Sequence, residues 1–180
     1  SYAIGREAKD PLNHVSKYTL ALSGQREDSS SRRDAFSMTL RETLQRLLSA
    51  GKNVVFVHDI PEAPFHPREC LSWSPNQFVT RVQRKECSYP ADYHVSWEAE
   101  FRPFLSGILK KFPQVAQIDP GPLFCNETRC VVKAAGNLLY RDFDHLSIFG
   151  SKWLAGRLIG QSDKVIDFRS ATDDVNLVTR

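Results

Sequence analysis

The segment from residue 35 to residue 57 restricts the chain to folds that combine helices with strands. Residues 35–51, AFSMTLRETLQRLLSAG, carry apolar side chains three or four positions apart and end in a glycine. This spacing predicts an amphipathic helix that stops at Gly51. Residues 53–57, NVVFV, form a continuous apolar, β-branched run, which is typical of a strand buried on both faces. A helix followed by such a strand indicates an α/β fold.

The rest of the chain continues to alternate between helical and extended patterns. Apolar runs and periodicity predict further elements, in chain order a strand at 18–22, a short helix at 76–85, a helical segment at 95–112, a strand at 114–120 and a hairpin at 131–140. Pro103 would either kink the helical segment or lie near the start of a second helix. Ser147 is placed to cap a last helix. Together these elements predict a three-layer α/β sandwich with a mainly parallel sheet.

Two segments between these elements are expected to form loops. Residues 23–34 are rich in serine and charge, and Ser31 or Asp34 would cap the helix that follows. Three prolines fall within residues 58–67 and exclude regular helix there. We therefore expect a crossing loop after the first buried strand.

Composition and charge indicate which kinds of binding partner and which cellular segments to expect. Hydrophobic residues make up 41% of the chain and charged residues 25%, which is typical of a soluble globular domain. The net charge is +3 without a basic stripe interleaved with aromatics, so we expect no nucleic-acid partner. No apolar run approaches the roughly 20 residues that span a bilayer, and the first residues lack a signal-peptide core. Any targeting or membrane segment is therefore expected outside this sequence.

Four cysteines raise the question of disulfides. Cys125 and Cys130 bracket a short polar turn and suit a local disulfide, whereas Cys70 and Cys87 would close a longer loop. Disulfides would indicate an oxidising compartment; four reduced thiols in a cytosolic protein are the alternative, and three pairings of four cysteines are possible. The chain has no C-x-x-C motif, and we expect neither a metal nor a cofactor.

The candidate site lies in residues 138–150, LLYRDFDHLSIFG, where Asp142 and His145 have the spacing D-x-x-H. A neutral imidazole can take a proton from a hydroxyl and return it to a leaving group. A carboxylate on the other ring nitrogen fixes the tautomer and stabilises the imidazolium. Residues three apart can meet in a turn, so the spacing suits acid–base catalysis. A polar turn followed by a helix cap is the alternative interpretation.

Three blocks of the sequence resemble a known family. LLYRDFDHLSIFGSKWLAGRL is similar to the last block of SGNH-type esterases, and most similar to the SGNH domains fused to membrane acyltransferases that O-acylate bacterial surface polysaccharides. The shared positions are Tyr140, Arg141, Asp142, Asp144, His145, Leu146, Ser147 and Gly150. NVVFVHDIPEAPF resembles the family's buried strand and Pro-Glu loop, and IDPGPLFCNETRCVV resembles its late strand and cysteine-bracketed turn.

The resemblance assigns roles to residues and also marks a departure. It implies that His145 is the catalytic base, that Asp142 orients it, and that Asp144 has no catalytic role. It also implies an SGNH-hydrolase or flavodoxin-like fold. The family's nucleophilic serine lies in an early G-D-S block, which this sequence lacks. We therefore expect residues 1–160 to be the C-terminal part of an SGNH-type domain, incomplete at its N-terminal side, and residues 161–180 to be a tail.

The function that the resemblance implies is O-acyl transfer, most simply of an acetyl group, to a hydroxyl of a cell-surface glycan. The serine would lie outside this chain, which alone would be close to inactive. A membrane-embedded acyltransferase domain would supply the acyl group, and the location would be periplasmic, tethered to the inner membrane. The alternatives are a carbohydrate O-acetylesterase that uses the same residues, and a noncatalytic glycan-binding or interaction domain.

Overall fold

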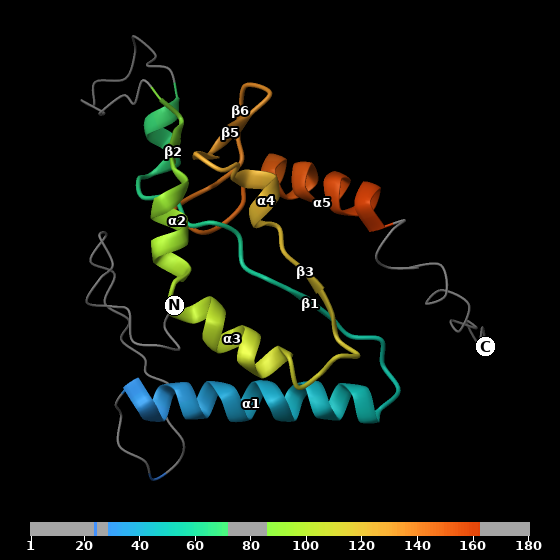
Figure 1. The fold of residues 1–180 in the computed structure, drawn as a ribbon. Helices are drawn as coiled ribbons and strands as arrows, with labels where there is room; N and C mark the ends of the chain where they lie inside the picture. Colours follow the sequence, from blue (N-terminus) through green and yellow to red (C-terminus); the bar gives the residue numbers. More distant parts are fainter. Residues whose placement is uncertain (1–23, 25–28, 72–85, 163–180) are drawn as a thin grey trace, which may run out of the picture. The chain divides into compact units, whose positions relative to one another are not determined.

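The computed structural model describes residue 24, residues 29–71 and residues 86–162. The strands and helices lie in the following order along the chain (Figure 1): α1 (Ser29–Ser49), β1 (Val55–Val57), the 3-10 helix η3 (Pro67–Cys70), β2 (Ser88–Pro90), α2 (Ala91–Glu98), α3 (Phe101–Leu109), β3 (Ala116–Ile118), α4 (Gly121–Phe124), β4 (Arg129–Val131), β5 (Lys133–Ala134), β6 (Asn137–Leu138) and α5 (Ile148–Ser162). The expected strand at 18–22 and helix at 76–85 lie outside the described residues, as do residues 163–180 of the expected tail, whereas residues 161 and 162 belong to α5.

The described elements belong to two compact units. One unit comprises Ser1–Val57 with Tyr93–Ile118, and the other comprises His58–Asp92 with Asp119–Arg180. The first unit contains α1, α3 and the β1–β3 pair, and the second contains the candidate site.

Helix α1 confirms the predicted helix and its glycine stop. Gly51 has φ +69°, a left-handed conformation that favours glycine, and its N–H donates to the carbonyl of Leu48. The helix begins earlier than predicted, at Ser29. The expected loop therefore ends sooner, and Ser31 and Asp34 lie inside the helix rather than capping it. Residues 29–34 are polar but contain no glycine or proline, so nothing in them interrupts helical geometry.

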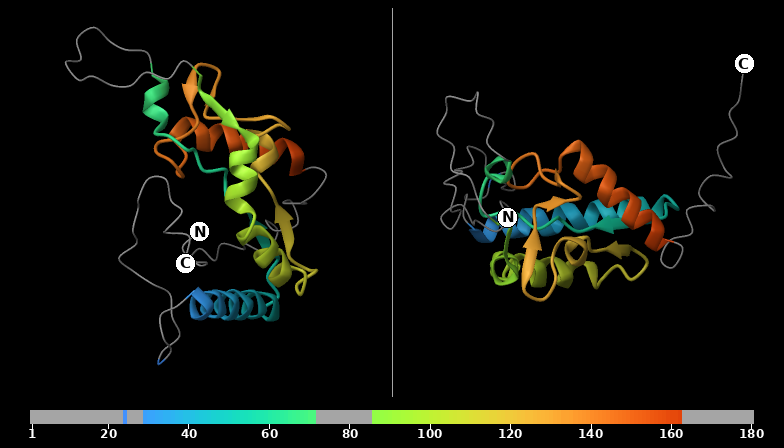
Figure 2. Two further views of the ribbon diagram at one scale, coloured as in Figure 1. Left: turned by 60° about the vertical axis from the view of Figure 1, so that its left-hand side comes forward. Right: turned by 90° about the horizontal axis from the view of Figure 1, so that it is seen from above.

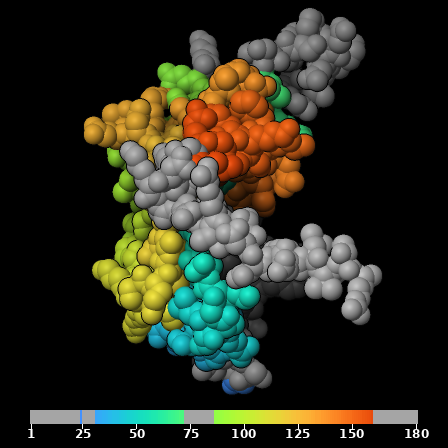
Figure 3. Space-filling model, turned by 90° about the vertical axis from the view of Figure 1, so that its right-hand side faces the viewer, coloured from blue at the N-terminus to red at the C-terminus, as the bar shows by residue number. Residues whose placement is uncertain are grey.

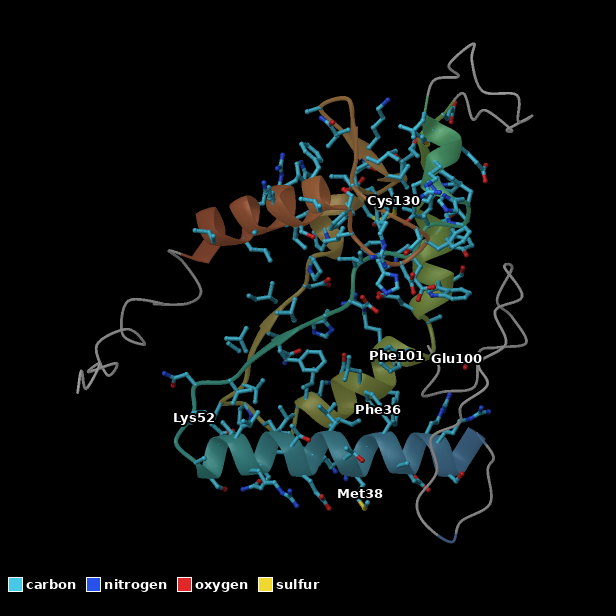
Figure 4. All side chains as sticks on the ribbon, turned by 180° about the vertical axis from the view of Figure 1, so that it is seen from behind. Phe36, Met38, Lys52, Glu100, Phe101 and Cys130 are labelled. Carbon is cyan, nitrogen blue, oxygen red and sulfur yellow. A yellow bond between two sulfur atoms is a disulfide. The ribbon has the colours of Figure 1, made fainter. Side chains whose placement is uncertain are left out.

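The core of the first unit forms where α1 meets α3. Six buried apolar side chains make up this core: Leu44, Leu105, Ile108, Leu109, Phe112 and Val115. Phe36 on α1 contacts Phe101 on α3 edge-to-face, with ring centroids 5.8 Å apart, whereas Met38 points to the opposite side of α1 (Figure 4). The apolar stripe of α1 is thus buried against α3, as its helical spacing predicts.

Pro103 occupies the third position of α3 and does not kink a longer helix. The helical segment predicted at 95–112 is two helices, because α2 ends at Glu98 and α3 begins at Phe101. The first N–H groups of a helix have no intrahelical partner, so a proline in the first turn removes no helical hydrogen bond. Of the two predicted alternatives, the start of a second helix is therefore confirmed.

Strands β1 and β3 lie side by side (Figures 1 and 2). They pair in parallel, with Val55 opposite Ala116. Both predicted strands are therefore present, although each is shorter than expected. The expected burial of the first strand on both faces is wrong at its end, because the side chain of Val57 is 52% exposed. Among the described residues β1 has one partner strand, and a strand with a single neighbour is incompletely covered.

The class of the fold is α/β, with helices and three two-stranded sheets in the described residues. One sheet is parallel, and the pairs β2–β4 and β5–β6 are antiparallel. This arrangement agrees with the predicted class, whereas the three-layer sandwich with a mainly parallel sheet stays a prediction.

The second unit begins with the proline-rich segment, which is irregular from residue 58 to residue 66, as predicted. Pro67 then opens η3, where its missing N–H costs no helical hydrogen bond. A disulfide joins Cys125 to Cys130 and confirms the predicted local link. The thiol of Cys87 lies 3.8 Å from the carbonyl oxygen of Cys70, without a disulfide between these two residues.

The predicted hairpin at 131–140 is formed by β5 and β6, which leads directly to the candidate site. Lys133 pairs with Leu138, and the turn residues Ala135 and Gly136 have φ +46° and +79°. Two left-handed residues in a two-residue turn match the right-handed twist of a hairpin. Helix α5 follows at the end of the chain's described part, and Figure 3 shows its outward face in red at the molecular surface.

Candidate active site

The candidate site is the loop of residues 139–147, which connects β6 to α5. Two backbone hydrogen bonds close this loop: the N–H of Ser147 donates to the carbonyl of Leu139 at 2.9 Å, and that of Arg141 donates to the carbonyl of His145 at 2.8 Å. The chain therefore turns back on itself within five residues. This tight turn brings side chains at its tip close together.

Ser147 joins the end of the loop to the start of α5. Its hydroxyl donates to the carbonyl of Leu138 at 2.7 Å and accepts the N–H of Gly150 at 2.9 Å. The second contact is the N-cap hydrogen bond predicted from the sequence, which is therefore confirmed. Both contacts fix the position of the helix relative to the strand before it.

Gly150 allows α5 to approach the backbone of the preceding strand. A Cβ atom at this position would lie 1.8 Å from the carbonyl oxygen of Leu139, a distance that no real Cβ contact shows. Any side chain here would push the helix away from the strand end. Glycine at this position is thus required by the close packing of helix on strand.

Two contacts attach the loop to the proline-rich segment of the same unit. The phenol of Tyr140, which is buried, donates to the carbonyl of Pro61 at 2.7 Å. Burial, and secondarily Tyr89 and Asp59, raises the pKa of Tyr140 far above its ordinary value, so this phenol remains a donor.

The second attachment is at the tip of the loop. The carbonyl of Phe143 accepts the N–H of Ala63 at 2.8 Å, and the Phe143 ring lies edge-to-face on the ring of His66, with centroids 5.2 Å apart. Because Phe143 lies between Asp142 and Asp144, holding its backbone also holds the two carboxylates that flank it.

Asp142 and His145 meet as the D-x-x-H spacing predicts. Oδ1 of Asp142 lies 2.8 Å from Nδ1 of His145 and also accepts the backbone N–H of His145 at 2.9 Å. Oδ2 accepts the guanidinium Nε of Arg141 at 3.1 Å. An ionised carboxylate can only accept, so the neutral ring carries its proton on Nδ1 and keeps the lone pair on Nε2. The side chain of His145 is 62% exposed.

Asp144 is a second acidic neighbour of the same ring nitrogen, which sequence reasoning did not anticipate. Its Oδ1 also lies 2.8 Å from Nδ1 of His145. No spacing rule signals this contact, because residues adjacent in sequence meet only when the chain bends sharply between them. The bend here follows from the hydrogen bond that joins Arg141 to His145.

The charges of this cluster act on one another. Partial burial opposes ionisation of Asp142, but the hydrogen bonds from the side chain and backbone of His145 and from Arg141 outweigh it and hold the pKa of Asp142 well below its ordinary value. Burial, and then the neighbouring Asp142, raises the pKa of Asp144. The hydrogen bond to Asp142, followed by the charge of Asp144, raises the pKa of His145.

The same three side chains are close enough together to meet around a cation. One ligand atom from each of Asp142, Asp144 and His145 lies within 4.8 Å of the others. Exposed acidic groups commonly lie together without an ion, and here the nitrogen faces two carboxylates as a hydrogen-bond donor would. We therefore assign no metal to this cluster.

In this site a carboxylate holds Nδ1 of an exposed imidazole and leaves Nε2 to accept a proton. Hydrolases and acyltransferases that use a serine nucleophile have the same acid–base arrangement. The arrangement of the candidate site and the α/β fold are both compatible with that class of enzyme. A family model described as the SGNH domain fused to AT3 domains matches residues 4–160. The chain belongs to this family, which supports an acyl-transfer or esterase activity in the broad sense and a membrane acyltransferase as the fused partner domain.

Comparison with curated proteins and with solved structures gives no match. None of the helices that the structure describes has both the length and the apolar character needed to cross a bilayer. SGNH domains fused to AT3 domains are typically extracytoplasmic.

Proposed function

We propose that this chain contributes the acid–base residues of an O-acyltransferase that modifies a hydroxyl of a cell-surface glycan. The observation that carries the proposal is the 2.8 Å contact between Asp142 and Nδ1 of His145 in a chain of the SGNH family. That contact gives Nε2 the protonation state a general base needs. His145 is the proposed catalytic residue, and Asp142 is the residue that positions it.

The proposed reaction proceeds in two steps. Nε2 of His145 takes the proton of a serine hydroxyl while the serine oxygen attacks the acyl carbonyl of the donor, and the same proton then leaves with the departing donor group. A glycan hydroxyl next gives its proton to Nε2 as it attacks the acyl-serine, and the serine recovers that proton when it leaves. Asp142 stabilises the imidazolium that exists between proton transfers.

The serine of this reaction is proposed to lie outside the 180 residues, because the sequence has no G-D-S block. Residues 1–160 would then be the C-terminal part of the SGNH domain and residues 161–180 a tail. The membrane-embedded AT3 domain would deliver the acyl group, and the domain would act in the periplasm, tethered to the inner membrane through that partner. Separated from the serine, the chain is expected to have little activity, since the members of such a site act as a unit.

The test is to replace His145 by alanine in the full-length acyltransferase and to measure acylation of the cell-surface polysaccharide by mass spectrometry. The variants H145A and D142N should lose acylation while the protein reaches the membrane at normal levels. K152A is the control, because Lys152 is exposed on the first turns of α5 and lies outside the loop of residues 139–147 that carries the imidazole. Unchanged acylation in H145A would refute the catalytic role.

Transfer to a glycan competes with transfer to water, which would make the enzyme an esterase. The side chain of His145 is 62% exposed, so this chain by itself does not exclude water from the imidazole. The two activities are separated by supplying acyl donor to the full-length protein with and without the acceptor glycan. Release of free acid at the same rate in both cases would favour the esterase.

A further inference from the structure

The ring of His145 has two carboxylate neighbours at one nitrogen. Oδ1 of Asp142 and Oδ1 of Asp144 each lie 2.8 Å from Nδ1. One N–H bond can point directly at only one acceptor, so the two carboxylates have different relations to the ring.

Asp142 is the carboxylate that fixes the orientation of the ring. Its contact with Nδ1 has hydrogen-bond geometry, and the same oxygen accepts the backbone N–H of His145 at 2.9 Å. Its second oxygen is held by Arg141 at 3.1 Å, and its side chain is mostly covered. Because both oxygens of Asp142 are hydrogen-bonded, its carboxylate has little freedom to turn. The imidazole ring that it holds is therefore restricted in orientation as well.

Asp144 contacts the ring as a charge rather than as the acceptor that orients it. Its 2.8 Å contact with Nδ1 is an ion-pair distance, and its side chain is 51% exposed. A negative charge at this distance stabilises the imidazolium more than the neutral ring, whatever the direction of the N–H bond. The backbone on either side of Asp144 is held by the Phe143–Ala63 and Arg141–His145 hydrogen bonds, so the carboxylate stays beside the ring.

We propose that Asp144 is a second positioning residue of the site, which strengthens His145 as a base by keeping negative charge against Nδ1 while Asp142 sets the orientation of the ring. The inference rests on the proposed function of His145 and goes beyond it, since the D-x-x-H motif has a role for only one carboxylate. Asp144 acts when Nε2 takes the serine proton, because the ring then carries a positive charge that both carboxylates beside Nδ1 stabilise.

Three charged groups act on His145 in the described part of the chain. Asp142 and Asp144 raise its pKa, and the guanidinium of Arg141 opposes them. On the segment that packs against the loop, His66 faces the Phe143 ring and Asp59 acts on Tyr140. Of the two carboxylates, Asp144 is the one whose removal lowers the negative charge at the ring without removing the orienting hydrogen bond.

The test compares the variants D144N and D144E with the unchanged protein. Asparagine keeps the size of the side chain and removes its charge, whereas glutamate keeps the charge. The titration of His145 is followed by NMR of the imidazole protons in the 180-residue chain, with a chelator present so that no cation occupies the cluster. The chain has five histidines, and the His145 signals are identified by their loss in H145Q.

The titration midpoint of His145 should fall in D144N and remain near that of the unchanged protein in D144E. In the full-length acyltransferase, the rise of activity with pH should move to lower pH in D144N, with a loss of about tenfold or less at the plateau, because a weaker base transfers a proton less readily. D142N should instead lose about 10⁴-fold at every pH, as expected when a ring loses its orienting carboxylate.

An unmoved titration midpoint in folded D144N would overturn the inference, as would a pH profile that falls in height without shifting. These failures differ from failure of the proposed function. If H145A loses acylation but D144N leaves the titration unchanged, His145 remains the base and Asp144 has no part in it. If H145A keeps full acylation, the proposed function fails, and the role of Asp144 fails with it.

Discussion

Replacing Gly150 by alanine is expected to separate α5 from the strand end on which the candidate site depends. The added Cβ would lie 1.8 Å from the carbonyl oxygen of Leu139, whereas ordinary contact begins at 3.4 Å, so the helix has to move by about 1.6 Å. Overpacking of this kind costs about 1–3 kcal/mol in the free energy of unfolding. The same movement breaks the contacts of Ser147 with the carbonyls of Leu138 and Leu139, each worth about 1 kcal/mol.

The expected total is a loss of about 3–5 kcal/mol, which for a chain of this size lowers the midpoint of thermal unfolding by about 6–20 °C. Gly156 supplies the matched control in the same helix, because a Cβ there meets nothing within 4 Å. G156A should be neutral or should stabilise the chain by up to about 1 kcal/mol, since glycine is a poor residue for a helix interior.

The assay is thermal unfolding of the three proteins followed by circular dichroism at one pH. We expect G150A to be the least stable of the three and G156A to be at least as stable as the unchanged chain. If G150A unfolds at the same temperature as G156A, then α5 does not pack on Leu139 as closely as described, and the account of the site's support is wrong.

Two further predictions concern the supports of the same loop. Y140F removes the donor to the carbonyl of Pro61 and leaves a buried acceptor unpaired, so the free energy of unfolding should fall by about 1–3 kcal/mol, and an unchanged urea midpoint would contradict this. The pKa of Asp142 is lower in the folded chain than its ordinary value of 3.8, so its ionised form stabilises the fold above that value, and the stabilisation is lost as the pH falls from that value to the lower pKa of the folded chain. The stability difference between the unchanged chain and D142N should therefore shrink as the pH is lowered from about 5 to about 2, and a difference that grows over that interval would refute the assignment.

The elements that the sequence predicted correctly are those whose pattern is local. The period of α1, its glycine stop at Gly51, the hairpin turn at Ala135–Gly136 and the Ser147 cap all depend on residues a few positions apart. The predicted start of α1 was wrong because polar residues without glycine or proline are compatible with either loop or helix. The predicted burial of Val57 was wrong because burial depends on which strands lie beside β1, and no local pattern contains that information.

The same distinction holds for the candidate site. The contact between Asp142 and His145 could be predicted, since a turn brings residues three apart together. The contact of Asp144 with the same nitrogen could not, because it requires the sharp bend that the hydrogen bond from Arg141 imposes. The hydrogen bond between Tyr140 and the carbonyl of Pro61 could not be predicted either, because 79 residues separate the two positions.

The loop that carries the imidazole is held mainly by main-chain atoms, and this affects how the site can be altered. Carbonyl and amide groups of Pro61, Ala63, Leu138, Leu139 and Phe143 make its anchoring bonds. Such groups are present whatever side chain a position carries. Several neighbouring side chains could therefore be exchanged while the imidazole keeps its place, provided that Gly150, Ser147 and Tyr140 are retained, because their own side chains, or the lack of one, make the contacts described above.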